Sequence, residues 1–360
     1  MMIRTSMFGV LIALDGRLVW DDTLMHRQTV LPPFTLLLLS KYAKMREWLP
    51  NTEITDTENV IVDWLLEREI LIDSEGKRGV YEIELMQCWR NWGSMARLYN
   101  FSTRTDIKTR VLTNKEDTKR LNEKLFYFPP PKRWNCPHDC ELTYLADDYT
   151  HEFLQKPFGN ILKGRRNCRN YVEKKISLSI LSALLDTSAG LSKERLRTPD
   201  DIISENYYRA APSGGARAST DVYVHARNVE SLKPGNYKYI PDLNALSKIG
   251  TFSSDKVIYD AICGQDWIMN CPVILILTAN LESVMWKYQT ARSYRALFLD
   301  AGHLSQVIQM VANALDLSAG FILMQRDELW ENELNISSAN EVVISILGIG
   351  FPDNSLKINV

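Results

Sequence analysis

The stretch YRALFLDAGHLSQVIQMVANAL, residues 294–315, is the strongest helical signal in the chain. Apolar side chains recur in it at spacings of three and four positions: Leu297, Ala301, Leu304, Ile308, Val311 and Leu315. This spacing gathers them on one face of a helix, and that face must pack against another element. The pattern therefore predicts a long core helix over residues 294–315.

Strand-like runs surround this helix without alternating regularly with helices. A second helix is predicted over Asn170–Leu185, and four strands are predicted over residues 221–226, 237–240, 272–279 and 342–347. The run at 272–279 is predominantly apolar, which is typical of a strand buried on both faces. This order predicts an α+β fold and argues against a Rossmann domain, which needs repeated βαβ units.

Composition sets broad limits on function. The chain has 360 residues, 45% of them hydrophobic, and 42 basic against 44 acidic side chains give a net charge of -2. No wide basic field is present, so we expect no nucleic-acid partner. The apolar run at Leu36–Leu39 is far shorter than a membrane span, so we expect a cytoplasmic protein with no membrane partner. Six scattered cysteines are too few for a disulfide scaffold, so we expect reduced thiols.

Residues 1–90 are predicted to form a winged-helix-like module. Asp15-Gly16 supplies the tight turn of a hairpin over residues 8–20, and two helical stretches follow, from Pro33 to Trp48 and over 57–69. Two further strands, Ile70–Ile72 and Gly79–Leu85, would then form the wing.

The second helical segment of this module is acidic, and such a surface repels phosphate. It carries one basic residue, Arg68, and five acidic residues: Asp56, Glu58, Asp63, Glu67 and Glu69. Two interpretations stay open. The module is either a packing arm of the larger domain or a peptide-docking unit that receives the substrate as an extra strand.

Residues 91–155 are interpreted as a connector and residues 156–360 as the main domain. Pro129–Pro131 enforces an extended backbone in the connector, and Thr113–Lys124 is predicted to be a charged, solvated helix. The motif CPHDC at 136–140 offers two thiols and an imidazole, but no second ligand pair follows at zinc-finger spacing. We therefore expect no metal site.

Three clusters in the main domain carry residues suited to chemistry. GRRNCRNY at 164–171 precedes the helix predicted from Asn170, where guanidinium groups and free backbone donors can meet a phosphate. RAAPSGGAR at 209–217 contains a turn whose glycines let the backbone approach a flat ligand. Lys287-Tyr288 offers two proton-transfer groups just before the long helix.

The order of these motifs resembles the nitroreductase superfamily, and within it the SagB-type azoline dehydrogenases. The order is RRxxRxY from Arg165, PSGGxR from Pro212, YRxxxxDAGH from Tyr294 and GIGFP from Gly348. The resemblance covers roughly residues 158–352 and implies a nitroreductase-like, FMN-binding domain.

The resemblance also implies a set of site residues. Lys287 and Tyr288 would be catalytic. The FMN-binding residues would be Arg165, Arg166, Asn167, Arg169, Pro212, Ser213, Gly214, Gly215, Arg217 and Arg295. In the implied homodimer, the first four would meet the phosphate, ribityl chain and pyrimidine edge, and the glycine turn of the neighbouring subunit would lie along the isoalloxazine.

The implied reaction is oxidation of an azoline in a peptide to a thiazole or oxazole, together with a cyclodehydratase or other biosynthetic proteins. Departures from the family pattern, such as Asn167 where a serine is usual and Asp300 where a glutamate is usual, keep two alternatives open. One is an NAD(P)H-dependent reductase of small molecules, which the shared fold permits. The other is a degenerate, non-catalytic subunit of a peptide-modifying complex. His303, one turn beyond Asp300, is interpreted as a structural hydrogen-bonding group.

Overall fold

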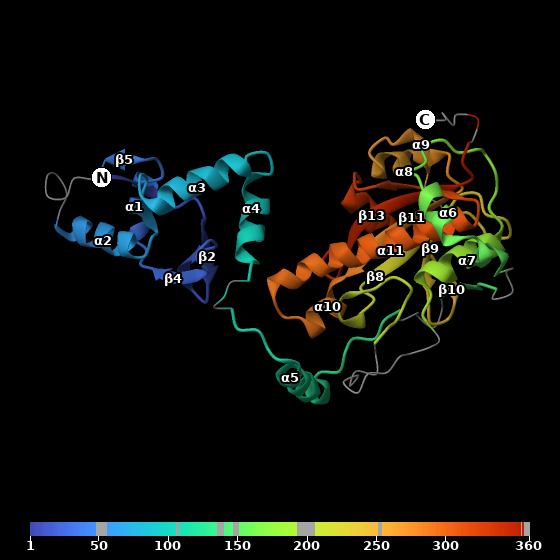
Figure 1. Ribbon diagram of the computed structural model, residues 1–360, viewed down its shortest axis with the longest axis horizontal. Coiled ribbons are helices and arrows are strands. Elements are labelled where there is room, and N and C mark those ends of the chain that lie inside the picture. Colours follow the sequence, from blue (N-terminus) through green and yellow to red (C-terminus); the bar gives the residue numbers. More distant parts are fainter. Residues whose placement is uncertain are drawn as a thin grey trace. The chain divides into compact units, whose positions relative to one another are not determined.

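The chain folds into two compact units, Met1–Arg110 and Val111–Val360 (Figure 1). The computed structural model describes residues 1–47, 56–105, 107, 109–134, 140–146, 151–192, 206–250, 254–353 and 355. Of the connector predicted over 91–155, helix α4 (Gly93–Ser102) belongs to the first unit, while helix α5 (Asn114–Tyr127) belongs to the second. No helix among the described residues is long and apolar enough to cross a membrane.

The second unit is built on a seven-stranded sheet in the order β12-β13-β11-β8-β9-β10-β7. The strands are β7 (Leu142–Tyr144), β8 (Thr220–Ala226), β9 (Gly235–Ile240), β10 (Ala245–Ile249), β11 (Val273–Asn280), β12 (Ser318–Ile322) and β13 (Glu341–Gly350). Every neighbouring pair is antiparallel. The four predicted strands are thereby confirmed, and so is the α+β class.

Both faces of this sheet are buried because its central strands alternate between two cores. In β11, Leu275 faces one core and Ile276 faces the other. Helices α7 (Leu178–Ala189) and α11 (Tyr294–Ala314) pack on the first face (Figure 1). Helices α8 (Asp255–Ala261) and α12 (Asp327–Leu334) pack on the second. The other helices in the described part of this unit are α6 (Phe158–Gly164), α9 (Asp266–Met269), α10 (Leu281–Lys287) and three short 3-10 turns at His151–Gln155, Gly214–Ala216 and Ala291–Ser293. The long helix predicted over 294–315 is confirmed.

The helix predicted over Asn170–Leu185 is wrong in its first half. The structure begins α7 at Leu178, where the Ser177 hydroxyl caps it by accepting from the amide of Ile180 at 3.2 Å. The preceding residues instead pair with the sheet edge, through bridges from Asn167 to Ala319 and from Tyr171 to Pro352. The arginine-rich segment therefore does not precede a helix directly, as the sequence analysis had assumed.

The described residues of the first unit form two three-stranded sheets and four helices. One sheet has the order β5-β1-β6, from Arg46–Glu47, Met2–Thr5 and Leu71–Asp73, and the other joins β2 (Gly9–Leu14), β3 (Arg17–Asp22) and β4 (Arg27–Leu31). The helices are α1 (Thr35–Lys41), α2 (Asp56–Glu67), α3 (Lys77–Cys88) and α4. The predicted hairpin is confirmed, with Asp15 and Gly16 at φ values of 49° and 70° in its turn.

The predicted second strand of the wing is wrong, because residues 79–85 lie inside helix α3. The helix brings Arg78 and Glu82 together four positions apart, at 3.1 Å, and aims Glu82 into the unit. There the fully buried carboxylate also accepts from Arg4 at 2.8 Å and from Ser6 at 2.6 Å. These partners lie more than 70 residues away, so the local pattern could not reveal them.

Cysteine chemistry departs from the prediction at one position. Cys88, Cys168, Cys263 and Cys271 are free thiols, but Cys140 is disulfide-bonded. Residues 136–139 of the CPHDC motif lie outside the described residues. Within the described ranges, no group of three or more His, Cys, Asp or Glu side chains is arranged to hold a metal ion.

Candidate active site

The turn before β8, residues 212–218, holds an unusual backbone conformation. Gly215, Ala216 and Ala218 have φ values of 62°, 55° and 45°. Positive φ costs a non-glycine residue about 1 to 2 kcal/mol, so the two alanines are strained. Such strain persists only where surrounding contacts fix the chain, and it concentrates at functional sites. We call residues 212–218 the glycine turn.

Helix α11 supplies the contacts that fix this turn. Asp300, buried on the helix, accepts from the Gly214 amide at 2.9 Å with one oxygen and from the Ser219 hydroxyl at 2.7 Å with the other. His303 lies one turn further along, and its Nδ1 donates to the Pro212 carbonyl at 3.2 Å. Burial raises the pKa of Asp300, while the hydrogen bonds from Ser219 and Gly214 oppose that rise. The structural role expected for His303 agrees with this contact.

Lys287 and Tyr288 lie against the same turn, at the end of α10. Nζ of Lys287 donates to the Gly215 carbonyl at 3.1 Å. A Cβ built on Gly215 would lie 2.5 Å from the Tyr288 hydroxyl and 2.8 Å from Cδ of Lys287. Burial raises the pKa of Tyr288, helped by Asp117 and Asp300 and opposed by Arg120 and Arg217. The predicted catalytic pair and the glycine turn therefore form one cluster.

Replacing Gly215 by alanine should displace this pair. The added methyl would overlap Tyr288 and Lys287, so the ends of these two side chains would have to move. The alanine would also have to adopt the positive φ that the glycine holds without strain. We expect roughly a ten- to hundredfold loss of turnover with a loss of stability of only about 1 to 2 kcal/mol. Steady-state kinetics and thermal unfolding would measure both, with Gly159→Ala as the control because nothing lies within 4 Å of a Cβ there. Equal turnover in the two variants would contradict this contact.

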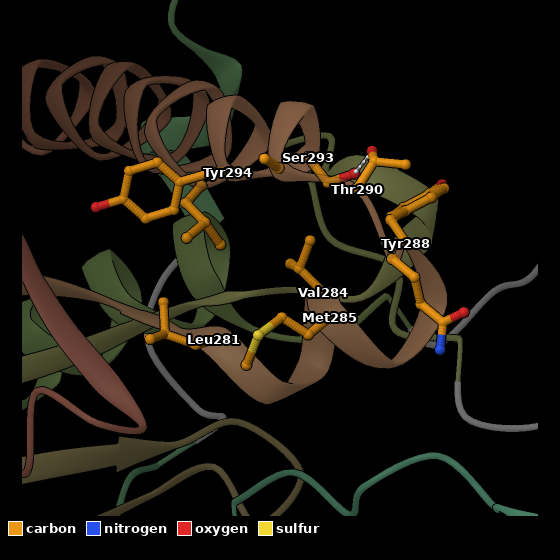
Figure 2. Close-up of a pocket in the computed structure, with 10 residues that line it drawn as sticks. Leu281, Val284, Met285, Tyr288, Thr290, Ser293 and Tyr294 are labelled. Carbon is orange, nitrogen blue, oxygen red and sulfur yellow. Dashed lines mark hydrogen bonds between the residues drawn. The ribbon is translucent and has the colours of Figure 1, made fainter. Parts of the chain in front are cut away.

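An apolar pocket opens on the other side of Tyr288 (Figure 2). It has a volume of about 490 Å³ between α10 and the start of α11, and none of its lining residues is charged. Leu281, Val284 and Met285 of α10 form one wall, and Tyr294 lies across from them in Figure 2. The cluster is therefore bordered by a space that suits an uncharged organic group.

The arginine-rich segment, residues 164–170, contacts a different part of α11. Arg165 donates to the side chain of Gln309 at 3.2 Å, whereas Arg166 folds back onto the carbonyl of Lys163 at 2.8 Å. Arg166, Asn167 and Arg169 are exposed and line a cavity of about 390 Å³. Asn313, in the last turn of α11, and Asp316, just after that helix, line the same cavity. This cavity carries two cations, Arg166 and Arg169, and two carboxylates, Asp316 and Asp353.

Within one chain, the two predicted cofactor-binding segments are not brought together. The glycine turn is held by Asp300, and the arginine-rich segment by Gln309, nine residues further along α11. At about 1.5 Å per helical residue this separates them by roughly 14 Å. Their closure around one ligand between two subunits stays a prediction.

The two remaining predicted cofactor residues occupy different surroundings. Arg217 is fully buried, with Nε donating to the Ser283 carbonyl at 3.2 Å and its guanidinium 5.2 Å from the ring centre of Trp286. It thereby ties the glycine turn to α10. Arg295 is half-buried at the second residue of α11.

Sequence reasoning missed the contribution of α5 to this cluster. Arg120 donates to the Lys287 carbonyl at 3.1 Å, and Lys124 donates to the Trp286 carbonyl. The helix was correctly predicted, but its charges were interpreted as solvated. The apolar position at Leu121 was the available signal, because Leu121 is buried and packs with Trp286.

Comparison with known proteins identifies the family of the second unit. A family model described as the Nitroreductase family matches residues 162–351, which is more than half of the chain. The chain belongs to the nitroreductase family. The glycine turn, α10 and α11 all fall inside the matched region, so the cluster described above lies within the nitroreductase domain.

Two curated relatives match parts of this domain. A protein of Methanocaldococcus jannaschii that is named as a nitroreductase is 28% identical over 158 residues, 44% of this chain and 74% of its own length. The trifolitoxin-processing protein TfxF of Rhizobium leguminosarum bv. trifolii is 32% identical over 139 residues, 39% of this chain and 44% of its own length. The chain therefore spans less than half of this second relative.

Solved structures match the fold more loosely. The Escherichia coli microcin synthetase McbBCD complex, with truncated pro-MccB17 bound, contains a chain that is 19% identical, with 75% of this chain and 94% of that chain covered and a TM-score of 0.45. A similarity at this level adds nothing to the family assignment.

Proposed function

We propose that the protein is an FMN-dependent dehydrogenase that oxidises azolines in a peptide to thiazoles or oxazoles. The observation that carries this proposal is the contact of Lys287 and Tyr288 with the glycine turn inside a nitroreductase domain. Such a contact places two proton-transfer groups beside backbone that a flat ring can approach. The name of the trifolitoxin-processing relative supports a biosynthetic substrate.

The residues present suit FMN in two respects. The glycine turn presents half-buried backbone at Gly214 and Gly215 beside the side chains of Lys287 and Tyr288, and a planar ring would lie along that backbone. Arg166 and Arg169 line the cavity that would receive the phosphate, since guanidinium groups bind phosphate oxygens in pairs. Because these two groups of residues lie at different positions along α11, the proposal includes a homodimer in which each cofactor contacts both chains. The exposed Phe298 and Leu299 of α11, 48% and 61% accessible, support contact with a second copy.

The chain's own residues would handle the proton. Aromatisation removes a proton from the ring Cα and a hydride from Cβ, a net loss of two hydrogens. Bound FMN would supply the acceptor for the hydride. The uncharged amine of Lys287 would take the Cα proton, held by its contact with the Gly215 carbonyl. Tyr288, whose pKa is raised by burial, would remain a neutral phenol that donates a hydrogen bond to the ring heteroatom or peptide backbone.

The apolar pocket beside Tyr288 would receive an uncharged part of the peptide next to the reacting ring. A cyclodehydratase that makes the azoline is the expected partner, and a cytoplasmic location is part of the same proposal. The first unit would serve as either a packing arm or a peptide-docking module.

The test is oxidation of a synthetic peptide that contains one thiazoline, followed by mass spectrometry. We expect the purified protein to be yellow and to remove about 2 Da from the peptide in air, without any nicotinamide. Rapid bleaching of the flavin by NADPH, with no change in the peptide, would favour the small-molecule reductase. A protein that retains no flavin after gentle purification would favour the non-catalytic subunit.

A further inference from the structure

Helix α5 is attached to the end of α10 that carries Lys287 and Tyr288. It begins with a complete capping box, in which Thr113 accepts from the Glu116 amide and Glu116 accepts from the Thr113 amide. Its buried residue Leu121 packs against Trp286, and the Trp286 indole donates to the Phe128 carbonyl at 2.9 Å. Although α5 is rich in charged side chains, the helix packs on α10 through a small apolar contact with hydrogen bonds around it.

Two cations of α5 satisfy the last carbonyls of α10. Arg120 donates to the carbonyl of Lys287 at 3.1 Å, and Lys124 donates to the carbonyl of Trp286. The final carbonyls of a helix have no partner within the helix, and its C-terminus attracts positive charge. Asp117 holds the Arg120 guanidinium in place, at 2.8 and 3.0 Å from two of its nitrogens.

The carbonyl that Arg120 binds belongs to the peptide unit joining Lys287 to Tyr288. A peptide unit is planar, so fixing the carbonyl also fixes the direction of the Tyr288 amide. That amide donates to the Val284 carbonyl at 2.9 Å. Two hydrogen bonds therefore fix the peptide unit between Lys287 and Tyr288, one at its carbonyl and one at its amide. This fixed peptide unit orients both side chains toward Gly215.

We infer that Arg120 is a positioning residue of the active site, acting on Lys287 and Tyr288 through their shared peptide unit. This inference rests on the proposed function, because it assigns a role within that site. Arg120 itself points to the backbone carbonyl and to Asp117, so it touches the pair without taking part in proton transfer.

Electrostatics give this role a distinguishing signature. The charged groups that face Tyr288 are Asp117 and Arg120 of α5, Asp300 of α11, Arg217 of the glycine turn and the neighbouring Lys287. Burial, Asp117 and Asp300 raise the pKa of Tyr288, while Arg120 and Arg217 lower it. Removing Arg120 should consequently raise the pKa of Tyr288 further. The alkaline limb of the pH–rate profile would then move to higher pH.

The experiment compares Arg120→Met with Lys119→Met in the full-length protein. Lys119 is the adjacent, exposed cation on the same helix, so its removal changes the net charge equally. For Arg120→Met we expect faster hydrogen exchange in Leu281–Tyr288, a kcat for the thiazoline peptide reduced by about tenfold at unchanged KM, and an alkaline limb shifted upward. Lys119→Met should leave all three unchanged, and Arg120→Lys should restore part of the rate.

The outcomes separate the inference from the proposed function. If Arg120→Met exchanges like the wild type over Leu281–Tyr288 and keeps its kcat and pH profile, the positioning role is wrong. If exchange increases but the wild-type protein never oxidises the thiazoline peptide, the proposed function fails while the structural link from α5 to the pair stands. Faster hydrogen exchange in strand β11 would show that Arg120→Met has lost its overall fold. In that case the milder Arg120→Lys variant replaces it, and we expect a reduced kcat with unchanged hydrogen exchange in β11.

Discussion

Replacing Lys287 by alanine should lower turnover of a thiazoline peptide by about a thousandfold while FMN stays bound. The side chain is the expected base, and general base catalysis contributes roughly 10²- to 10⁴-fold. Its loss removes the hydrogen bond from Nζ to the Gly215 carbonyl. The turn keeps its bonds to Asp300 and His303, so the surroundings of the cofactor should persist.

Single-turnover kinetics and the flavin absorbance spectrum would measure these two results together. Lys256→Ala is the matched control, since Lys256 is an exposed lysine of α8 on the opposite face of the sheet. Turnover of Lys287→Ala within threefold of the control would remove Lys287 from the mechanism. Loss of flavin from the variant would instead assign the lysine a binding role.

Replacing Glu82 by alanine should destabilise the first unit by about 3 to 5 kcal/mol. The fully buried carboxylate is bound by Arg4 and Arg78, by the Ser6 hydroxyl and by the Met7 amide at 3.0 Å. Removing it leaves the Arg4 side chain, 8% exposed, without its acidic partner. An unpaired charge in a low-dielectric interior costs far more than an exposed ion pair contributes.

Hydrogen exchange on the full-length protein would detect this loss region by region. We expect protection to fall in β1 and α3 while the strands of the second unit keep theirs, because the two units have separate cores. Glu84→Ala is the control, since Glu84 is exposed on the same helix. Unchanged protection of β1 and α3 in Glu82→Ala would show that the carboxylate does not hold the unit together.

The peptide-docking interpretation of the first unit remains a prediction, and its structure bears on it only in part. The module has two sheets with edge strands, but residues 79–85 form a helix where a wing was expected. Helix α2 was predicted correctly. The expectation that its acidic side chains repel nucleic acid stays a prediction.

Local sequence pattern alone determined the elements whose signals need no distant partner. The apolar stripe from Leu297 to Leu315 defined α11, the apolar run at 272–279 defined β11, and Asp15-Gly16 defined the first hairpin. The order of the motifs that begin at Arg165, Pro212, Tyr294 and Gly348 likewise indicated the nitroreductase family, which the family match confirms. For the helix, the strand and the hairpin, neighbours within a few positions carry the information.

Tertiary structure alone decided which of these groups touch. Lys287 meets Gly215 from 72 residues away and Arg120 from 167, and Glu82 meets Arg4 from 78. Tertiary contacts also outweighed the local pattern at two places. Residues 167 and 171 pair with the sheet edge, and α7 begins only at Leu178. Residues 79–85, predicted as a strand, form a helix that buries Glu82. The physical reason is that such contacts form only when the whole chain closes on itself, and their energies then outweigh the small local preferences that a sequence displays.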